Sequence, residues 1–192
     1  MAVIRNVFAL IGLLVLVAMG AAMVKVGGIL DEFDPGAVQI YRELIENIVE
    51  TRNAAEATVW KVPVEEGLKP EDVEQTMKAV ANELNISNVG ELPLYKDVAA
   101  KSGQPYRFVK IYMFCNSLTA ARMLDYNDAF SAYLPCRITL VEDKQGKLWL
   151  YALNMDLMIQ GGERLPPALK EEALHVKKVI LEIMRRGAVG DF

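Results

Sequence analysis

The hydrophobic pattern is clearest around residues 107–115, where it predicts a β-strand. The odd-numbered positions form one wholly apolar face, made of Val109, Ile111, Met113 and Cys115. The even-numbered positions are mostly apolar as well and comprise Phe108, Lys110, Tyr112 and Phe114. Alternation with a period of two is typical of strands, and apolar residues on both faces indicate a central strand that is covered on both sides.

A β-hairpin is predicted after this strand and a short intervening helix. Cys136, Ile138 and Leu140 share one face of its first strand, while the residues between them point the other way. Residues 143–146 read Asp-Lys-Gln-Gly and predict a turn in which the glycine supplies a positive φ. Residues 148–153 then return as a strand that carries Trp149 and Tyr151.

Helical periodicity and turn residues predict the elements around these strands. Apolar residues recur at helical spacing over 71–84 and again over 169–183, and a shorter helix is expected over 117–124. Residues 58–64 are predicted to form an edge strand that Pro63 ends. Residues 85–103 are rich in turn formers, with one short helix expected over 94–100.

An uncharged apolar stretch near the N-terminus predicts a membrane segment. Residues 7–24 carry no charge, and apart from Lys25 the apolar run continues to Leu30. Because about 20 apolar residues cross a bilayer, we predict a transmembrane anchor over residues 1–30, with membrane lipid as its partner. The alternative is a cleaved signal peptide, with Arg5 before the apolar run and small residues at 20–22. The length of the run favours the anchor.

The side of the membrane is predicted from the layout of the chain. Arg5 precedes the segment while Lys25 and Arg42 follow it, so the distribution of positive charge does not decide the orientation. A very short tail before the segment, with the whole domain after it, favours export of the C-terminal part. We therefore expect a single-pass membrane protein with a periplasmic domain.

An amphipathic neck helix is predicted within residues 31–54. Asp34 and Pro35 are residue types that commonly begin a helix, and a broad apolar stripe follows them. The stripe packs either on the adjoining domain or on a partner, which would be a second copy of the chain or another membrane protein subunit. The candidate interface consists of Ile40, Tyr41, Leu44, Ile45 and Ile48.

Charge and composition exclude several classes of function. The 192-residue chain has a formal net charge of −4 and no basic patch, so nucleic acid is not an expected partner. Its single histidine, His175, excludes catalytic triads and histidine-based zinc or haem sites. The sequence also lacks glycine-rich phosphate loops and dinucleotide fingerprints. The lack of a catalytic set disfavours an enzyme, and we expect no cofactor.

The remaining polar and sulfur-containing residues receive structural interpretations. The nine methionines are interpreted as core and membrane filling, because a copper site of the thioether type needs clustered methionines and the sequence shows no cluster. Glu163 and Arg164 are interpreted as a solvated surface pair. We therefore expect no bound metal.

The two cysteines leave three interpretations open. Cys115 and Cys136 lie on apolar strand faces, where free cysteine packs as a small hydrophobe. Their 20 intervening residues do not match a zinc or redox motif, which favours cysteines two to four positions apart. If the helix between them carries the chain back, the thiols lie at opposite ends of the sheet. Packing is favoured over a functional thiol site with Asn116, and a disulfide is the third interpretation.

The segments around the cysteines resemble a known family. The run Phe-Cys-Asn at 114–116, the run beginning Leu-Pro-Cys at 134–136, the glycine turn and the aromatic strand are similar to the family of domains of unknown function 302. Ser117 stands where a branch of that family has proline. The resemblance implies an α+β domain with a single antiparallel sheet and helices packed on one face, often dimeric, with no established activity. We set the domain at residues 55–192.

Two hypotheses about function follow. In the first, the protein is a non-catalytic, membrane-anchored accessory or assembly subunit of a membrane protein complex. In the second, Cys115, Asn116 and Cys136 form a thiol-based redox or small-ligand-binding site. A cysteine exposed in a concave pocket would favour the second hypothesis, and two sealed cysteines beside a partner surface would favour the first.

Overall fold

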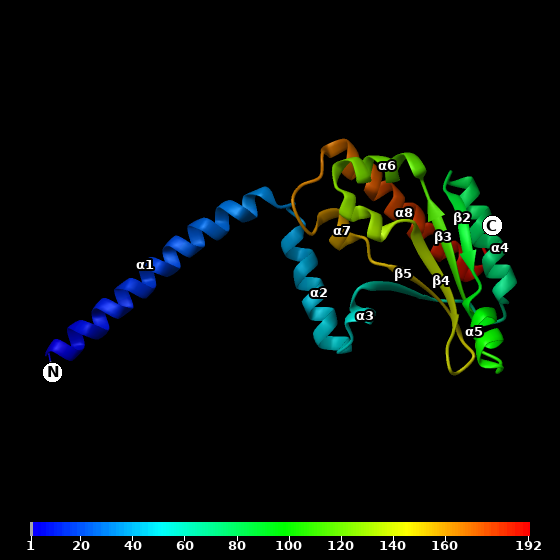
Figure 1. Ribbon diagram of the computed structural model, residues 1–192, viewed down its shortest axis with the longest axis horizontal. Helices are drawn as coiled ribbons and strands as arrows, with labels where there is room; N and C mark the ends of the chain where they lie inside the picture. Colours follow the sequence, from blue (N-terminus) through cyan, green and yellow to red (C-terminus); the bar gives the residue numbers. More distant parts are fainter. Residues whose placement is uncertain (1) are drawn as a thin grey trace.

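Five antiparallel strands form one sheet in the computed structural model, which describes residues 2–192 (Figure 1). Their order across the sheet is β1-β5-β4-β3-β2, so the predicted strand and hairpin form its centre. The single antiparallel sheet and the α+β class are thereby confirmed. The strands are β1 (Val59–Pro63), β2 (Ser87–Leu92), β3 (Val109–Cys115), β4 (Cys136–Glu142) and β5 (Leu148–Leu153).

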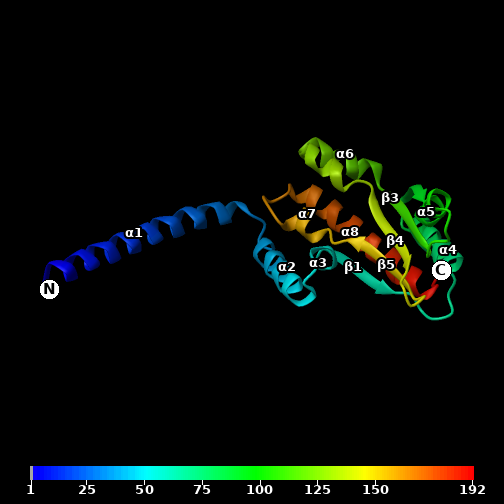
Figure 2. The same ribbon diagram turned by 60° about the horizontal axis from the view of Figure 1, so that its bottom comes forward.

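Two long helices cover one face of this sheet. Helices α4 and α8 pack against each other, and Figure 2 shows α8 lying along the strands. The core between these helices and the sheet contains the fully buried side chains of Met77, Val80, Ile180, Ile183, Tyr112, Phe114, Ile138, Leu140 and Leu150. The helices are α1 (Ala2–Glu32), α2 (Ala37–Thr51), α3 (Ala54–Ala57), α4 (Pro70–Glu83), α5 (Leu94–Ser102), α6 (Ser117–Tyr126), α7 (Asp156–Gln160), α8 (Pro167–Val189) and the 3-10 helix η1 (Asp128–Tyr133).

The two faces of β3 differ from the prediction. Tyr112 and Phe114 are fully buried, and the Tyr112 hydroxyl donates to Glu74 of α4, so the even-numbered face is the one under the helices. Ile111 and Met113, on the wholly apolar face, remain partly exposed. The expectation that β3 is covered on both sides is wrong, because these side chains lie beside the polar Thr139 and Arg137 of β4 rather than under a helix layer.

One edge strand was not predicted. β2 has no apolar alternation, yet it pairs with β3, with a register shift between Asn88 and Gly90. A Cβ at Gly90 would lie 2.8 Å from the Cε of Met113, so glycine permits the close approach. The strand depends on this pairing rather than on its own propensity.

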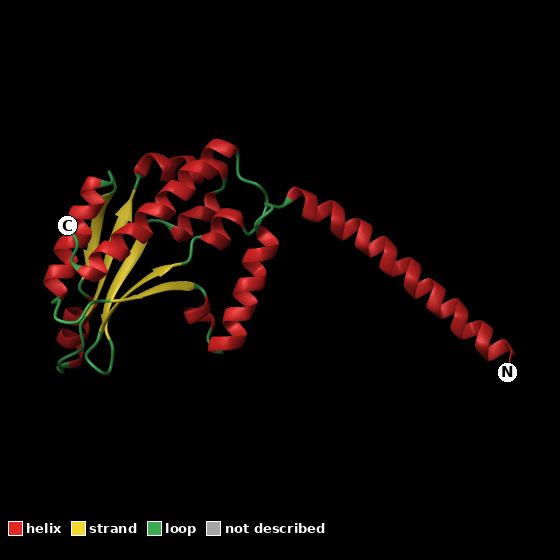
Figure 3. Cartoon of the chain, turned by 180° about the vertical axis from the view of Figure 1, so that it is seen from behind, coloured by secondary structure: helices red, strands yellow, loops and turns green. Residues whose placement is uncertain are grey.

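Hydrogen bonds from Arg164 fix the C-terminal end of α1 to the domain. Arg164 donates from Nε to the Phe33 carbonyl (2.8 Å) and from a terminal nitrogen to the Asp31 carbonyl (3.1 Å). Carbonyls at the C-terminal end of a helix lack partners and carry partial negative charge, so a guanidinium group stabilises them. Figure 3 shows α1 projecting away from the domain beyond this junction. Arg164 therefore bonds to the helix end, and it remains exposed as the sequence indicated.

Asp34 belongs to the same junction. Only 4% of the residue is exposed, and its backbone N–H donates to the Gly162 carbonyl (2.9 Å). Its carboxylate accepts a hydrogen bond from the Gly36 N–H (2.9 Å) and forms an ion pair with Lys170 of α8. Burial opposes ionisation of this carboxyl group, but the hydrogen bonds from Lys170 and Gly36 outweigh it and lower its pKa. The regular helix α2 begins later than predicted, at Ala37, but the Asp34 carboxylate accepts the Gly36 N–H and so caps the turn that leads into it.

We predict that Lys170→Met lowers the free energy of unfolding by about 1–3 kcal/mol, because it leaves the buried Asp34 carboxylate without its cation. Lys101→Met is the matched control, since its pair with Asp97 is exposed and is expected to contribute less than about 0.5 kcal/mol. Urea unfolding of the detergent-solubilised chain measures both changes.

The destabilisation caused by Lys170→Met should depend on pH. The Asp34 pKa is lowered by folding, so its contribution is present above the unfolded pKa of about 3.9 and is lost as the pH falls through the folded value. The difference between Lys170→Met and the unmodified chain should therefore shrink in acid. An equal effect of Lys101→Met and Lys170→Met at neutral pH would contradict the role of this pair.

Candidate functional site

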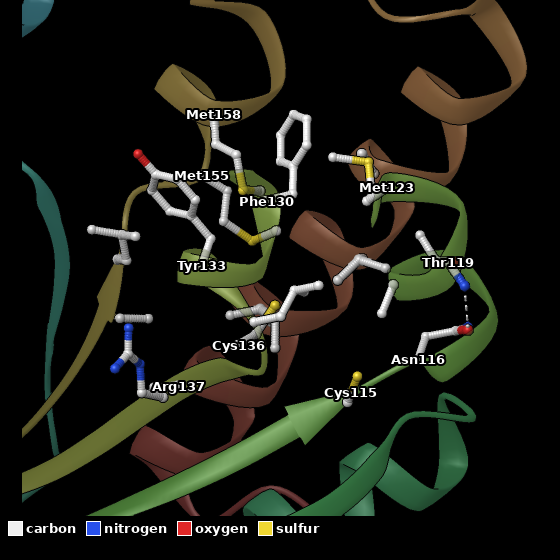
Figure 4. Close-up of a pocket in the computed structure, with 17 residues that line it drawn as sticks. Cys115, Asn116, Thr119, Met123, Phe130, Tyr133, Cys136, Arg137, Met155 and Met158 are labelled. Atoms are coloured by element: carbon white, nitrogen blue, oxygen red, sulfur yellow. Dashed lines mark hydrogen bonds between the residues drawn. The ribbon is translucent and has the colours of Figure 1, made fainter. Parts of the chain in front are cut away.

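A cavity of about 50 Å³ lies at one end of the sheet, beside both cysteines (Figure 4). The ends of β3 and β5 and the start of β4 form its floor, and α6, η1, α7 and α8 provide its other walls. Most of the lining is apolar. Among the residues that line it are Cys115, Asn116, Thr119, Ala120, Met123, Phe130, Tyr133, Cys136, Arg137, Met155, Met158 and Ala173.

The path of the chain explains why the two cysteines meet. β3 ends at Cys115 and β4 begins at Cys136, and because these strands are antiparallel neighbours, the chain re-enters the sheet at the end that it left. Phe114 is the register partner of Cys136. The expectation that the thiols lie at opposite ends of the sheet is therefore wrong: the helical segment between them folds over one end and does not cross the sheet.

Asn116 positions the wall that follows β3. Its Oδ1 accepts a hydrogen bond from the Thr119 N–H (3.1 Å) and so caps α6. The Thr119 hydroxyl then donates to Glu172 of α8 (3.1 Å), and Arg122 binds the same carboxylate (2.8 Å). All three predicted site residues line the cavity, but the side-chain oxygen of Asn116 is already engaged in this structural contact.

Both thiols are free and partly buried. Burial raises the pKa of the Cys136 thiol to about 11, and the neighbouring Cys115 contributes in the same direction. A thiol with such a pKa is protonated at neutral pH and is a poor nucleophile. Both thiols line a concave pocket, but they are neither exposed nor sealed, so their burial does not decide between the two hypotheses.

Three methionines that the sequence analysis did not assign to a site join the cysteines around the cavity. Met123 comes from α6, while Met155 and Met158 flank the start of α7 (Figure 4). Met123 and Met155 are distant in sequence, so no local motif reveals the cluster. A spacing of three positions, as between Met155 and Met158, was the one available signal, because it places two helical side chains on one face.

The sequence matches the family described as Domain of unknown function DUF302 over residues 60–186. The chain belongs to this family. α1 and α2 precede the matched residues, while every residue of the cavity lies within them. None of the curated proteins matches the chain.

A solved structure shows the same fold. It is the crystal structure of an uncharacterized conserved DUF302 protein from Bacillus stearothermophilus, with 18% identity and a TM-score of 0.55. The match covers 67% of this chain and 97% of that chain. At this identity the likeness supports the DUF302 fold and carries no information about activity.

The candidate interface on α2 divides into two parts. Ile40 and Leu44 are partly buried and line a groove of about 230 Å³ beside β5 and α7. Tyr41, Ile45 and Ile48 are exposed. One edge of the apolar stripe therefore packs on the DUF302 domain, and the other edge is open.

A charged cluster at the opposite side of the core is internally satisfied. Lys78 and Lys110 each bind both Glu74 and Glu91, with separations of 2.5–2.7 Å, and Tyr112 donates to Glu74. Burial opposes ionisation of Glu74, yet hydrogen bonds from Lys110, Lys78 and Tyr112 lower its pKa to about 2. Two cations balance two carboxylates, so we interpret the cluster as a structural link between α4, β2 and β3.

We predict slow alkylation of Cys136 in the folded protein. With a pKa of about 11 instead of about 8.5, its thiolate fraction at neutral pH is lower by about two orders of magnitude, and the rate should rise with pH. Iodoacetamide labelling of Cys115→Ser, followed by mass spectrometry, isolates Cys136. The urea-unfolded variant serves as the reference, and equal rates in the two states would contradict the raised pKa.

Proposed function

We propose that this DUF302 chain is a non-catalytic, membrane-anchored binding protein whose site is the cavity between the sheet end and α6, α7 and α8. The observation that carries the proposal is the presence of two partly exposed thiols on the wall of a concave, mainly apolar cavity. Among the residues that line it there is no histidine and no carboxylate, so general acid–base chemistry lacks its usual groups. Binding is the function that this lining supports.

The volume of the cavity limits the ligand. About 50 Å³ exceeds the roughly 10–15 Å³ that one water requires. It is well below the roughly 300 Å³ at which pockets for drug-sized ligands and cofactors begin. The ligand is therefore an ion or a molecule of a few heavy atoms.

The anchor belongs to the same proposal. Ile4–Gly28 is long and apolar enough to cross a membrane, although signal sequences share these properties. The length of the apolar run favours retention of this segment as an anchor over cleavage at residues 20–22, and in either case Arg164 and Lys170 bind residues 31–34.

The experiment that tests the site uses xenon as a probe of accessible apolar volume. With methyl-labelled methionine, xenon pressure on the micelle-bound chain should shift the signals of Met123, Met155 and Met158 to saturation. Met77 and Met184, which are fully buried elsewhere in the core, should not respond. Met19 and Met23 of α1 report partitioning of xenon into the micelle.

Ala173→Val provides the matched variant. The added methyl groups enter the cavity from α8 and should abolish the saturable shifts without unfolding the domain. Shifts that persist in Ala173→Val, or that are missing in the unmodified chain, would overturn the binding site.

A second candidate function rests on the open edge of α2. Val38, Tyr41, Ile45 and Val49 are 65%, 43%, 60% and 71% exposed immediately after the anchor. Contiguous exposed apolar residues are typical of surfaces that bind another protein or a membrane. This edge favours a role as accessory or assembly subunit, in contact with another membrane protein subunit or a second copy.

We predict that the double variant Ile45→Asp, Val49→Asp reduces the size of the assembly extracted from membranes, because it places two charges on the apolar edge. Gln39→Asp on the exposed polar side is the control. Cross-linking in membranes followed by native electrophoresis measures the assembly. An unchanged size, with the thermal unfolding of the domain also unchanged, would exclude this edge as the interface.

A further inference from the structure

The donor atoms around the cavity are mainly sulfur. Five of its residues carry a sulfur atom: Cys115, Met123, Cys136, Met155 and Met158. The side-chain oxygens of Asn116 and Thr119 are engaged in other hydrogen bonds: Asn116 caps α6, and Thr119 donates to Glu172. The hydroxyl of Tyr133 points away from the sulfur atoms in Figure 4. Hard ions such as Mg²⁺ and Ca²⁺, which need several oxygen ligands, therefore have no ligand set here.

We propose that this cavity binds one soft monovalent metal ion, Cu(I), through the thiols of Cys115 and Cys136 and the thioethers of the methionines. Thiolate and thioether ligands select Cu(I) over the harder divalent ions. The inference rests on the proposed binding function and names its ligand. Zn²⁺ is disfavoured, because it takes four ligands from cysteine, histidine and carboxylate, and this lining offers two cysteines.

The sulfur-bearing residues come from two layers of the structure. Cys115 and Cys136 approach from adjacent strands, which fixes their backbones. Met155 and Met158 approach from α7 on the other side, and their side chains extend toward Cys136 in Figure 4. Methionine has three rotatable side-chain bonds, so its sulfur can move onto an ion without a change of backbone. A cavity of about 50 Å³ holds a bare ion but no hydrated one with a full shell of waters.

Charge also balances at this position. Binding forms a sulfur–copper bond at each thiol and releases its proton to solvent, while copper remains Cu(I) and no electron is transferred. One bound ion and two thiolates leave a single negative charge. Arg137, which follows Cys136 on β4, is the cation among the lining residues that can compensate that charge.

The test measures Cu(I) binding by the full chain in detergent without oxygen, with bicinchoninate as the competing chelator. We expect one Cu(I) per chain and an X-ray absorption spectrum of sulfur ligation only. Cys115→Ser and Cys136→Ser should each weaken binding at least 100-fold, and the double variant Met155→Leu, Met158→Leu at least tenfold. Met113→Leu on the exposed face of β3 is the control and should leave the affinity unchanged.

The possible results separate the two proposals. Saturable xenon shifts without Cu(I) binding would overturn the metal site and leave the binding cavity standing. If neither saturable xenon shifts nor Cu(I) binding is observed, both the binding cavity and the metal site are wrong. Copper that binds with nitrogen or oxygen ligands, or with an affinity that Met155→Leu, Met158→Leu does not change, would also overturn the sulfur site. Competition by Ag(I) but not by Zn²⁺ is the expected selectivity.

Discussion

The antiparallel register of β3 and β4 is the constraint on which the site depends. Because Phe114 pairs with Cys136, the chain leaves and re-enters the sheet at one end, and the 20 residues between the cysteines must fold over that end. β5 is antiparallel to β4 in turn, with Ala152 opposite Ile138, so it also finishes there and delivers α7 to the same place. Three segments that are separate in sequence thus converge without any crossover connection.

The packing around this end differs from that of the rest of the core. Between α4, α8 and the middle of the sheet, side chains such as Met77, Ile183 and Leu140 are sealed completely. At the sheet end, the small side chains of Ala120 and Ala173 leave space. Larger apolar residues at these alanines would occupy the volume of about 50 Å³, so the open volume is a property of the sequence and not of the fold alone.

Local patterns predicted the elements whose own residues determine them. The hairpin followed from the alternation after Cys136 and from the turn before Lys147, and the long helices followed from apolar spacing. The edge strand β2 was missed because its residues are strand-like only when paired with β3. The open face of β3 was misjudged because its side chains are all apolar, and a sequence does not show that the polar Thr139 and Arg137 of β4 lie beside Ile111 and Met113. Of the candidate site, the sequence identified the two cysteines and Asn116, while the methionines required the structure.

The contacts of Arg164 with the end of α1 limit how far the domain can move from the membrane. Only residues 33–36 separate α1 from α2, an extended length of about 14 Å, and Arg164 and Lys170 hold that segment to the domain. If α1 lies in a bilayer, no flexible linker joins it to the domain, so the domain stays close to the lipid surface. If the cavity binds the proposed ligand, any protein that exchanges this ligand with the domain would have to meet it at the membrane surface.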